Sequence, residues 1–168
     1  MAHAVVRTDK MFGTDNRAGV CSAKYMGSGS TATAIDNGNV VKLNGLVTGE
    51  REVYKAVTPA AGSDIKDIVL VASPEIIYDE IKKGLDDFTN GAGEIVRGYY
   101  LHTNDIFSVT ADALSGVSDN TKVGDIVELQ ADTKLKVVTS ATSGSTQIGT
   151  IIEIANAGRF KYYAIQVA

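Results

Sequence analysis

Several residue types are scarce in this chain of 168 residues, which has one cysteine, two prolines, two histidines and no tryptophan. The single cysteine, Cys21, excludes an internal disulfide, and with it the small, disulfide-stapled scaffolds of many secreted proteins. No basic segment followed by an apolar core opens the sequence, and no apolar run approaches about 18 residues. We therefore expect a protein that is made in the cytoplasm and has no membrane partner.

Positive charge is also in short supply, because 16 Lys and Arg stand against 20 Asp and Glu, for a net charge of −4. This balance argues against a nucleic acid as partner. The charge is unevenly placed, since residues 1–26 sum to +2 and the remaining residues sum to −6. A mildly basic segment before an acidic body is one way to dock on a partner, although so few charges can also fall this way by chance.

Leucine is rare relative to the β-branched residues: Val, Ile and Thr together number 47, against 8 Leu. β-branched side chains fit a pleated sheet better than a helix. Runs of such residues, separated by Gly, Asn and Asp, recur every ~8–12 residues, as in sandwiches and barrels. We predict an all-β fold whose body is a β-barrel or β-sandwich.

Strands are expected wherever a short apolar run lies between turn signals. The run at 67–72, DIVLVA, is continuously apolar, so it should be a central strand covered on both faces. The runs at 94–101 and 105–114 should pair as a hairpin around a turn at 102–104. The other strands are expected at 37–45, 50–58, 123–130, 133–140, 146–154 and 159–168.

One short helix is predicted, at SPEIIYDEIKKG (Ser73–Gly84). Ser73 can cap its start, Pro74 suits the first helical position and Gly84 can end it. Ile77 and Ile81 would share one face. A helix of about 11 residues is marginal without packing, so we expect a short helix or helical turn within a long excursion.

The first 34 residues differ in pattern from the rest of the chain. They show no period of 2 or 3.6, and GSGSTATA (Gly27–Ala34) offers nothing to pack. We predict an extended N-terminal arm and linker over residues 1–34, ahead of a body over residues 35–168. Such an arm needs another surface to cover its apolar side chains.

Two stretches of the body nearly repeat, GNVVKL (Gly38–Leu43) and GDIVEL (Gly124–Leu129). Each precedes an isoleucine-rich run, and Asp64–Val71 aligns with Gln147–Ile154. The body is either two pseudo-repeated β units or two ordinary three-strand meanders that look alike because both are built from Val and Ile. Neither copy carries a residue able to do chemistry, so we interpret both as framework.

No group of residues indicates catalysis or a metal site. His3 and His102 lie far apart in the sequence, and neither has a second ligand at metal spacing. Cys21 has no partner motif and is expected to be a small hydrophobe. The carboxylate pairs Asp79-Glu80 and Asp86-Asp87 are adjacent, whereas acid–base work needs carboxyls that converge across a cleft. We predict that the protein is not an enzyme and uses no metal and no cofactor.

Tyrosine occurs in two adjacent pairs, Tyr99-Tyr100 and Tyr162-Tyr163. Neither pair lies in a basic run, which again argues against nucleic acid. Strand alternation places one tyrosine of each pair inside the fold and one outside. The outer one is either an ordinary surface tyrosine or part of an interface.

The block VLVASPEIIYDEIKKGLDDFTNGAGEIVRGYYL…DIFSVTADAL (Val69–Leu114), with the closing VGDIVELQ…IGTIIEI, resembles a family of phage proteins. These are the head decoration or auxiliary capsid (head-fibre-like) proteins encoded beside the major capsid gene in tailed bacteriophages. The resemblance implies a structural virion protein that binds the capsid exterior and stabilises it, without catalysis or cofactor. The implied partners are the major capsid protein and further copies of this chain, with a trimer favoured.

The resemblance also implies that the N-terminal arm lies on the capsid. The residues expected to contact the capsid are Val5, Val6, Arg7, Lys10, Met11, Phe12, Arg17, Lys24 and Tyr25. The alternative is a non-catalytic ligand- or receptor-binding β-barrel module displayed on a virion or cell surface, although the lack of tryptophan argues against sugar stacking. A small β-barrel hydrolase, the third possibility, lacks a nucleophile–base pair.

Overall fold

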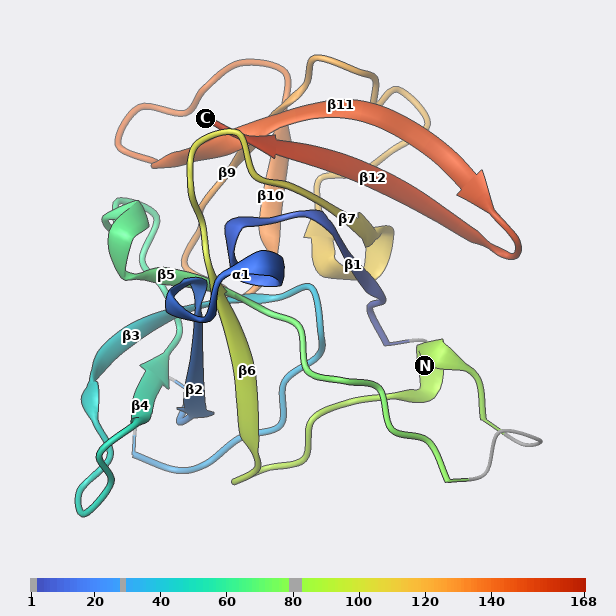
Figure 1. Ribbon diagram of the computed structural model, residues 1–168. Helices are drawn as coiled ribbons and strands as arrows, with labels where there is room; N and C mark the ends of the chain where they lie inside the picture. The colour runs from blue at the N-terminus through green and yellow to red at the C-terminus, as the bar shows by residue number, and fades with distance from the viewer. Residues whose placement is uncertain (1–2, 28–29, 79–82) are drawn as a thin grey trace.

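A computed structural model describes residues 3–27, 30–78 and 83–168. The strands form two units, a closed five-stranded barrel and a curled seven-stranded sheet that lies over it (Figure 1). The prediction of an all-β fold with a barrel is therefore confirmed. The one α-helix of the described residues, α1 (Phe12–Asp15), is a single turn.

The barrel has the strand order β2-β4-β3-β5-β6 and closes between β6 and β2. Its strands are β2 (Val20–Tyr25), β3 (Val40–Leu46), β4 (Val53–Val57), β5 (Ile68–Val71) and β6 (Ile95–Tyr100). Only β2 and β4 are parallel. The buried cluster inside the barrel is made mostly of small side chains, because five strands leave a narrow interior: Ala23, Tyr25, Ile35, Val41, Ala56, Val69, Val71 and Val96.

The second unit has the strand order β1-β7-β12-β11-β9-β10-β8. Its strands are β1 (Val6–Lys10), β7 (Ile106–Thr110), β8 (Leu114–Ser115), β9 (Ile126–Glu128), β10 (Leu135–Val138), β11 (Gln147–Ala157) and β12 (Phe160–Val167). All neighbours are antiparallel except β8 and β10. The long β11–β12 hairpin extends beyond its neighbours at one side of the molecule (Figure 1).

Strand β5 lies in the core of both units. Its side chains alternate, with Ile68 and Leu70 in the cluster that joins the barrel to the sheet, and Val69 and Val71 in the barrel interior. All four are fully buried. The predicted central strand at 67–72 is thus confirmed.

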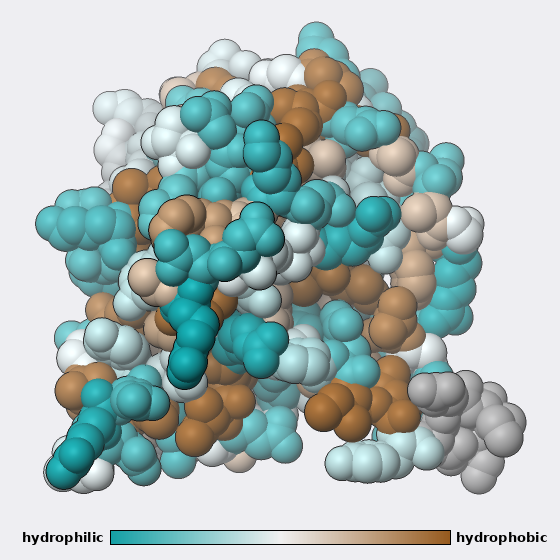
Figure 2. All heavy atoms as spheres, viewed as in Figure 1, coloured by the Kyte–Doolittle hydropathy of each residue, from teal (hydrophilic) through white to brown (hydrophobic). Residues whose placement is uncertain are grey.

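Within the described residues, four single turns of 3-10 helix connect the strands. They are η1 (Arg17–Gly19), η2 (Ile65–Asp67), η3 (Leu85–Asp87) and η4 (Ala111–Ala113). On the face shown in Figure 2, hydrophobic residues form separate patches among hydrophilic ones.

The prediction of an extended N-terminal arm was wrong for the described residues between 3 and 34. β1 forms the edge of the sheet beside β7, and β2 lies between β4 and β6, so that it closes the barrel. The segment crosses from one unit to the other within a few residues, through α1 and η1. Each short strand buries different faces in different cores, and this is why the sequence shows no single period.

The predicted helix at 73–84 was wrong over residues 73–78, which form no helix; residues 79–82 lie outside the described part of the chain. The Asn37 side chain bonds to both the N–H and the C=O of Ser73, at 3.0 and 2.9 Å. These bonds hold Ser73 in the barrel framework. Ile76 and Tyr78, on either side of the partly buried Ile77, are 63% and 98% exposed, so this stretch has little packing that would stabilise a short helix.

The hairpin between the strands at 94–101 and 105–114 was also wrong. β6 pairs with β2 and β5 in the barrel, whereas β7 pairs with β1 and β12 in the sheet. The turn at 102–105 passes the chain from one unit to the other. Two consecutive strands with a short turn look the same in sequence whether or not they pair.

The two pseudo-repeated units have the same strand pairing. β3 lies between β4 and β5, antiparallel to both, and β9 lies between β10 and β11 in the same way. In each unit the opening strand is therefore central, the next strand pairs on one side and the third on the other. One copy of the repeat, β3–β5, belongs to the barrel, and the other copy, β9–β11, belongs to the sheet.

The backbone bonds at the start of the repeat are also equivalent. Gly38 N–H donates to the Val71 carbonyl, and Val71 N–H donates to the Asn39 carbonyl, both at 2.8 Å. Gly124 and the residue after it bond to Ile151 in the same way, at 2.8 and 2.9 Å. Val71 therefore corresponds to Ile151, three residues before the position that the sequence alignment assigned, because the repeated isoleucines allow several alignments.

A third copy of this arrangement appears at the start of β7. Asn104 N–H donates to the Val167 carbonyl at 3.0 Å, and Val167 N–H donates to the Asp105 carbonyl at 2.9 Å. The turn residues Gly38, Gly124 and Asn104 have φ angles of +81°, +95° and +70°. This left-handed region favours glycine and tolerates asparagine. The same strand-opening turn thus occurs in both the barrel and the sheet.

This geometry predicts different results at two equivalent turn positions, a loss of stability at one and no change at the other. A Cβ added at Gly124 meets no atom within 4 Å, so Gly124→Ala should lower the free energy of unfolding by about 1–2 kcal/mol through backbone strain alone. Asn104→Gly relieves that strain and should be neutral within about 0.5 kcal/mol. Urea unfolding measures both variants. Equal stability of Gly124→Ala and the parent chain would contradict the assigned conformation.

Glu128 on β9 is a charged residue inside the fold, 1% exposed. Its Oε2 accepts a bond from Thr142 N–H at 2.9 Å, and Lys136 Nζ lies 3.5 Å from Oε1. Burial by itself would raise the pKa of Glu128, but the bonds from Thr142 and the Lys136 ammonium together outweigh it and lower the pKa below its ordinary value. The carboxylate thereby ties the 139–146 loop to the sheet.

We expect Glu128→Gln to lower the free energy of unfolding at neutral pH by about 1–2 kcal/mol. Because the folded-state pKa lies below the unfolded one, the contribution of the carboxylate is complete above the unfolded-state pKa. It is lost as the pH falls through the folded-state pKa. Urea unfolding at neutral pH and near pH 3 should show the gap between parent and variant narrowing in acid. Glu50→Gln, in an exposed turn, is the control; a gap that does not change with pH would contradict this role.

Candidate functional site

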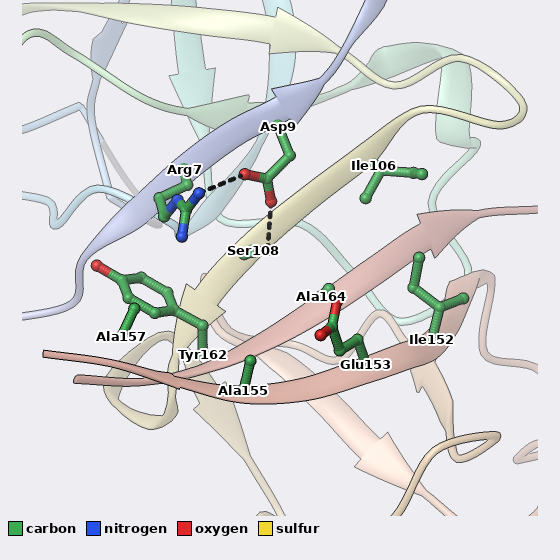
Figure 3. Close-up of a pocket in the computed structure, with 10 residues that line it drawn as sticks. All are labelled: Arg7, Asp9, Ile106, Ser108, Ile152, Glu153, Ala155, Ala157, Tyr162 and Ala164. Atoms are coloured by element: carbon green, nitrogen blue, oxygen red, sulfur yellow. Dashed lines mark hydrogen bonds and ion pairs between the residues drawn. The ribbon is translucent and has the colours of Figure 1, made fainter.

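A recess of about 270 Å³ lies on the outer face of the seven-stranded sheet (Figure 3). Strands β1, β7, β12 and β11, which are neighbours in this order, supply its lining. The lining residues are Arg7, Asp9, Ile106, Ser108, Ile152, Glu153, Ala155, Ala157, Tyr162 and Ala164.

Strand alternation explains why the recess exists. On β7, Phe107 and Val109 point into the core, so Ser108 between them points outward. On β12, Tyr163 and Ile165 point into the core and Ala164 points outward. These outward-facing positions carry mostly small side chains, whereas larger side chains on the flanking strands β1 and β11 surround them.

One end of the recess is polar. Arg7 Nη2 lies 3.4 Å from Asp9 Oδ1, and the Ser108 hydroxyl donates to Asp9 Oδ2. The Arg7 guanidinium lies over the Tyr162 ring, 5.4 Å from its centroid. Figure 3 shows these four side chains converging across β1, β7 and β12. Asp9 thus holds both the arginine and the serine in place.

Tyr162 and Glu153 complete the electrostatics of the site. Burial raises the pKa of Tyr162, and the nearby Arg7 only partly offsets this, so the phenol is neutral at physiological pH. A bulge in β11 shifts the register between Ile151 and Glu153, and Figure 3 shows the Glu153 side chain beside Ala164. The recess therefore offers one cation, two carboxylates and a neutral phenol around a strip of Ala and Ile.

The contacts of Ser108 fix its side chain and do not activate it as a nucleophile. Its hydroxyl is buried and bonded to a carboxylate, whereas a nucleophilic serine is normally activated by an imidazole. The two imidazoles lie elsewhere: His3 Nδ1 is 2.8 Å from Asp36, and the His102 ring lies against Phe12, 4.5 Å between centroids.

The described residues contain neither a metal-binding cluster nor a membrane-spanning helix. Within residues 3–27, 30–78 and 83–168, no group of three or more His, Cys, Asp or Glu could hold a metal ion. In the same ranges, no helix is long and apolar enough to cross a bilayer.

The nine residues expected to contact a capsid do not form one surface. Three are buried in the fold (Val5, Met11 and Tyr25), two are partly buried (Val6 and Lys24), and four are exposed (Arg7, Lys10, Phe12 and Arg17). Seven are distributed over β1, α1, η1 and β2; Val5 precedes β1, and Met11 lies between β1 and α1. Of the nine, only Arg7 lines the recess.

Sequence reasoning missed most of the recess. Strand alternation predicted that one tyrosine of the Tyr162-Tyr163 pair faces outward but not which one; Tyr162 lines the recess, and Tyr163 packs in the core. Ser108 and Ala164 carried the signal of period-two alternation, but it does not reveal which strands lie side by side. Strands β1 and β7 pair across about 100 residues of chain, and this pairing brings Arg7 to Ser108.

No family model matches the chain, and neither the curated proteins nor the solved structures contain a match to it. The function must therefore be argued from the residues and their geometry.

Proposed function

We propose that this protein is a non-catalytic structural protein of a tailed-phage virion that binds the outer surface of the capsid and stabilises it. The proposal combines the sequence resemblance of Val69–Leu114 with one observation, the recess beside a free strand edge on the outer face of the sheet. The partner is the major capsid protein.

The free edge belongs to β11. This strand pairs with β9 only over Gln147–Thr150, but with β12 as far as Ala157. Along the rest of β11, no other strand of the described chain pairs with the side opposite β12. Unpaired backbone N–H and C=O groups at such an edge can accept an extended segment of a partner as an added strand.

The recess lies next to this edge and supports the same use. Ile152, Ala155 and Ala157 belong to β11 and line the recess. A segment added along β11 would therefore place side chains above the apolar strip, close to the charged pair Arg7 and Asp9. Backbone bonds supply affinity in this mode, and the recess supplies selectivity.

The N-terminal segment takes a different role from the one expected of an arm. Its strands β1 and β2 belong to the sheet and the barrel, so deleting residues 1–26 would remove the edge strand of the sheet and open the barrel. We propose that the segment contributes to capsid binding through Arg7 on β1. Copies repeated over a capsid lattice, including trimers, would reinforce a modest affinity through avidity.

A charge placed on this surface tests the proposal. Ala157 is exposed at the rim of the recess, so Ala157→Arg should leave the melting temperature unchanged and weaken binding to purified expanded capsids at least tenfold. Thr48→Arg adds the same charge at an exposed turn between β3 and β4 and should bind like the parent chain. Cosedimentation with the capsids measures the affinity.

Two outcomes of this experiment would count against the proposal. Equal binding of Ala157→Arg and the parent chain would show that the sheet face is not the contact surface. Absence of binding by the parent chain would remove the capsid as the partner.

A further inference from the structure

A second concave site lies at one end of the five-stranded barrel, in a pocket of about 420 Å³. Its floor is made by Cys21, Tyr54 and Tyr100, one from each of β2, β4 and β6. Each of the three packs against the buried cluster of the barrel interior. The pocket is therefore the mouth of the barrel.

Strand alternation explains the floor. Cys21 is two residues before the interior Ala23, and Tyr54 is two residues before the interior Ala56, so they point to the same side of their strands. Below them the interior is closed by fully buried side chains. Barrel mouths with a closed floor are a common place for ligand sites.

Two groups of the floor are held in their neutral form at physiological pH. Burial raises the pKa of the Cys21 thiol to about 11, and burial also raises the pKa of Tyr100, which the neighbouring Cys21 and Tyr54 push further upward. A protonated thiol and the protonated Tyr100 phenol can donate hydrogen bonds and do not repel an anion.

The rim carries the charge. Arg17, at the start of η1, and Arg51, just before β4, both line the mouth, together with one acidic residue, Glu52. Neither guanidinium makes an ion pair or a side-chain hydrogen bond to another residue of the described chain. The mouth thus gathers two arginines that have no side-chain partner among the described residues, in a protein of net charge −4.

We propose that the barrel mouth binds an oxyanion, either a carboxylate or a phosphate, between the guanidinium groups of Arg17 and Arg51 and above the phenols of Tyr54 and Tyr100. A guanidinium presents a planar fork of donors that matches both anions. The phenols contribute further donors from the floor. This site lies on the barrel, whereas the proposed capsid surface lies on the sheet, so neither proposal depends on the other.

Titrations of the full-length, ¹⁵N-labelled protein, followed by NMR, test the site with two probes. One is inorganic phosphate, and the other is a short polyglutamate peptide with blocked ends. We expect saturable shifts of the Arg17 and Arg51 side-chain signals with at least one probe. The double variant R17A/R51A should weaken that binding at least tenfold, and R17K/R51K should recover part of it, because the charge remains while the fork is lost.

The matched control is K122A/K134A, which removes the same charge from loops that flank the sheet strands and should bind like the parent chain. Saturation by the peptide alone would identify a carboxylate presented by a protein, and saturation by phosphate alone a free oxyanion. Linear, non-saturating shifts with both probes would overturn the proposal. An equal loss of binding in the control would also overturn it, because it would reduce the effect to net charge.

Discussion

The burial of β5 on both faces is the constraint on which the rest of the structure depends. Ile68 and Leu70 hold the sheet against the outside of the barrel, while Val69 and Val71 fill the barrel itself. Because one strand belongs to two cores, the barrel and the sheet cannot be separated without exposing its side chains. The N-terminal segment adds a second connection, since its two strands complete one unit each. Both concave surfaces are held in place by this shared framework.

Local patterns predicted the strands of the body, including the doubly covered β5, because burial leaves a direct mark on side-chain type, but they did not predict β1 and β2. The repeat was also visible, and its physical basis is a turn that needs a positive φ, which Gly38 and Gly124 supply. What the sequence could not show is pairing between distant strands. The segment 1–34 looked like an arm because its partners, β4, β6 and β7, follow it in the chain. The helix at 73–84 failed because its capping signals carried no information about packing.

The two surfaces differ in how far they could be predicted. Arg7 and Arg17 were both among the residues expected to contact a capsid, and each lines a different concavity. Ser108 on β7 and Arg51 before β4 line the same two concavities, but no sequence pattern marks them, because only the strand order brings them next to Arg7 and Arg17. The proposed roles divide accordingly: the outer face of the sheet offers an edge and an apolar strip to a protein partner, and the barrel mouth offers the guanidinium groups of Arg17 and Arg51 to an anion.

The central claim is that the protein decorates a capsid through the outer face of its sheet. Electron cryo-microscopy of capsids carrying the bound protein tests it most directly. The account predicts density on the exterior of the shell in which the β11–β12 hairpin and the recess around Arg7 face the capsid protein, with a capsid segment beside β11. Density that attaches the protein through the β3–β4 hairpin, or a shell without added density, would contradict it.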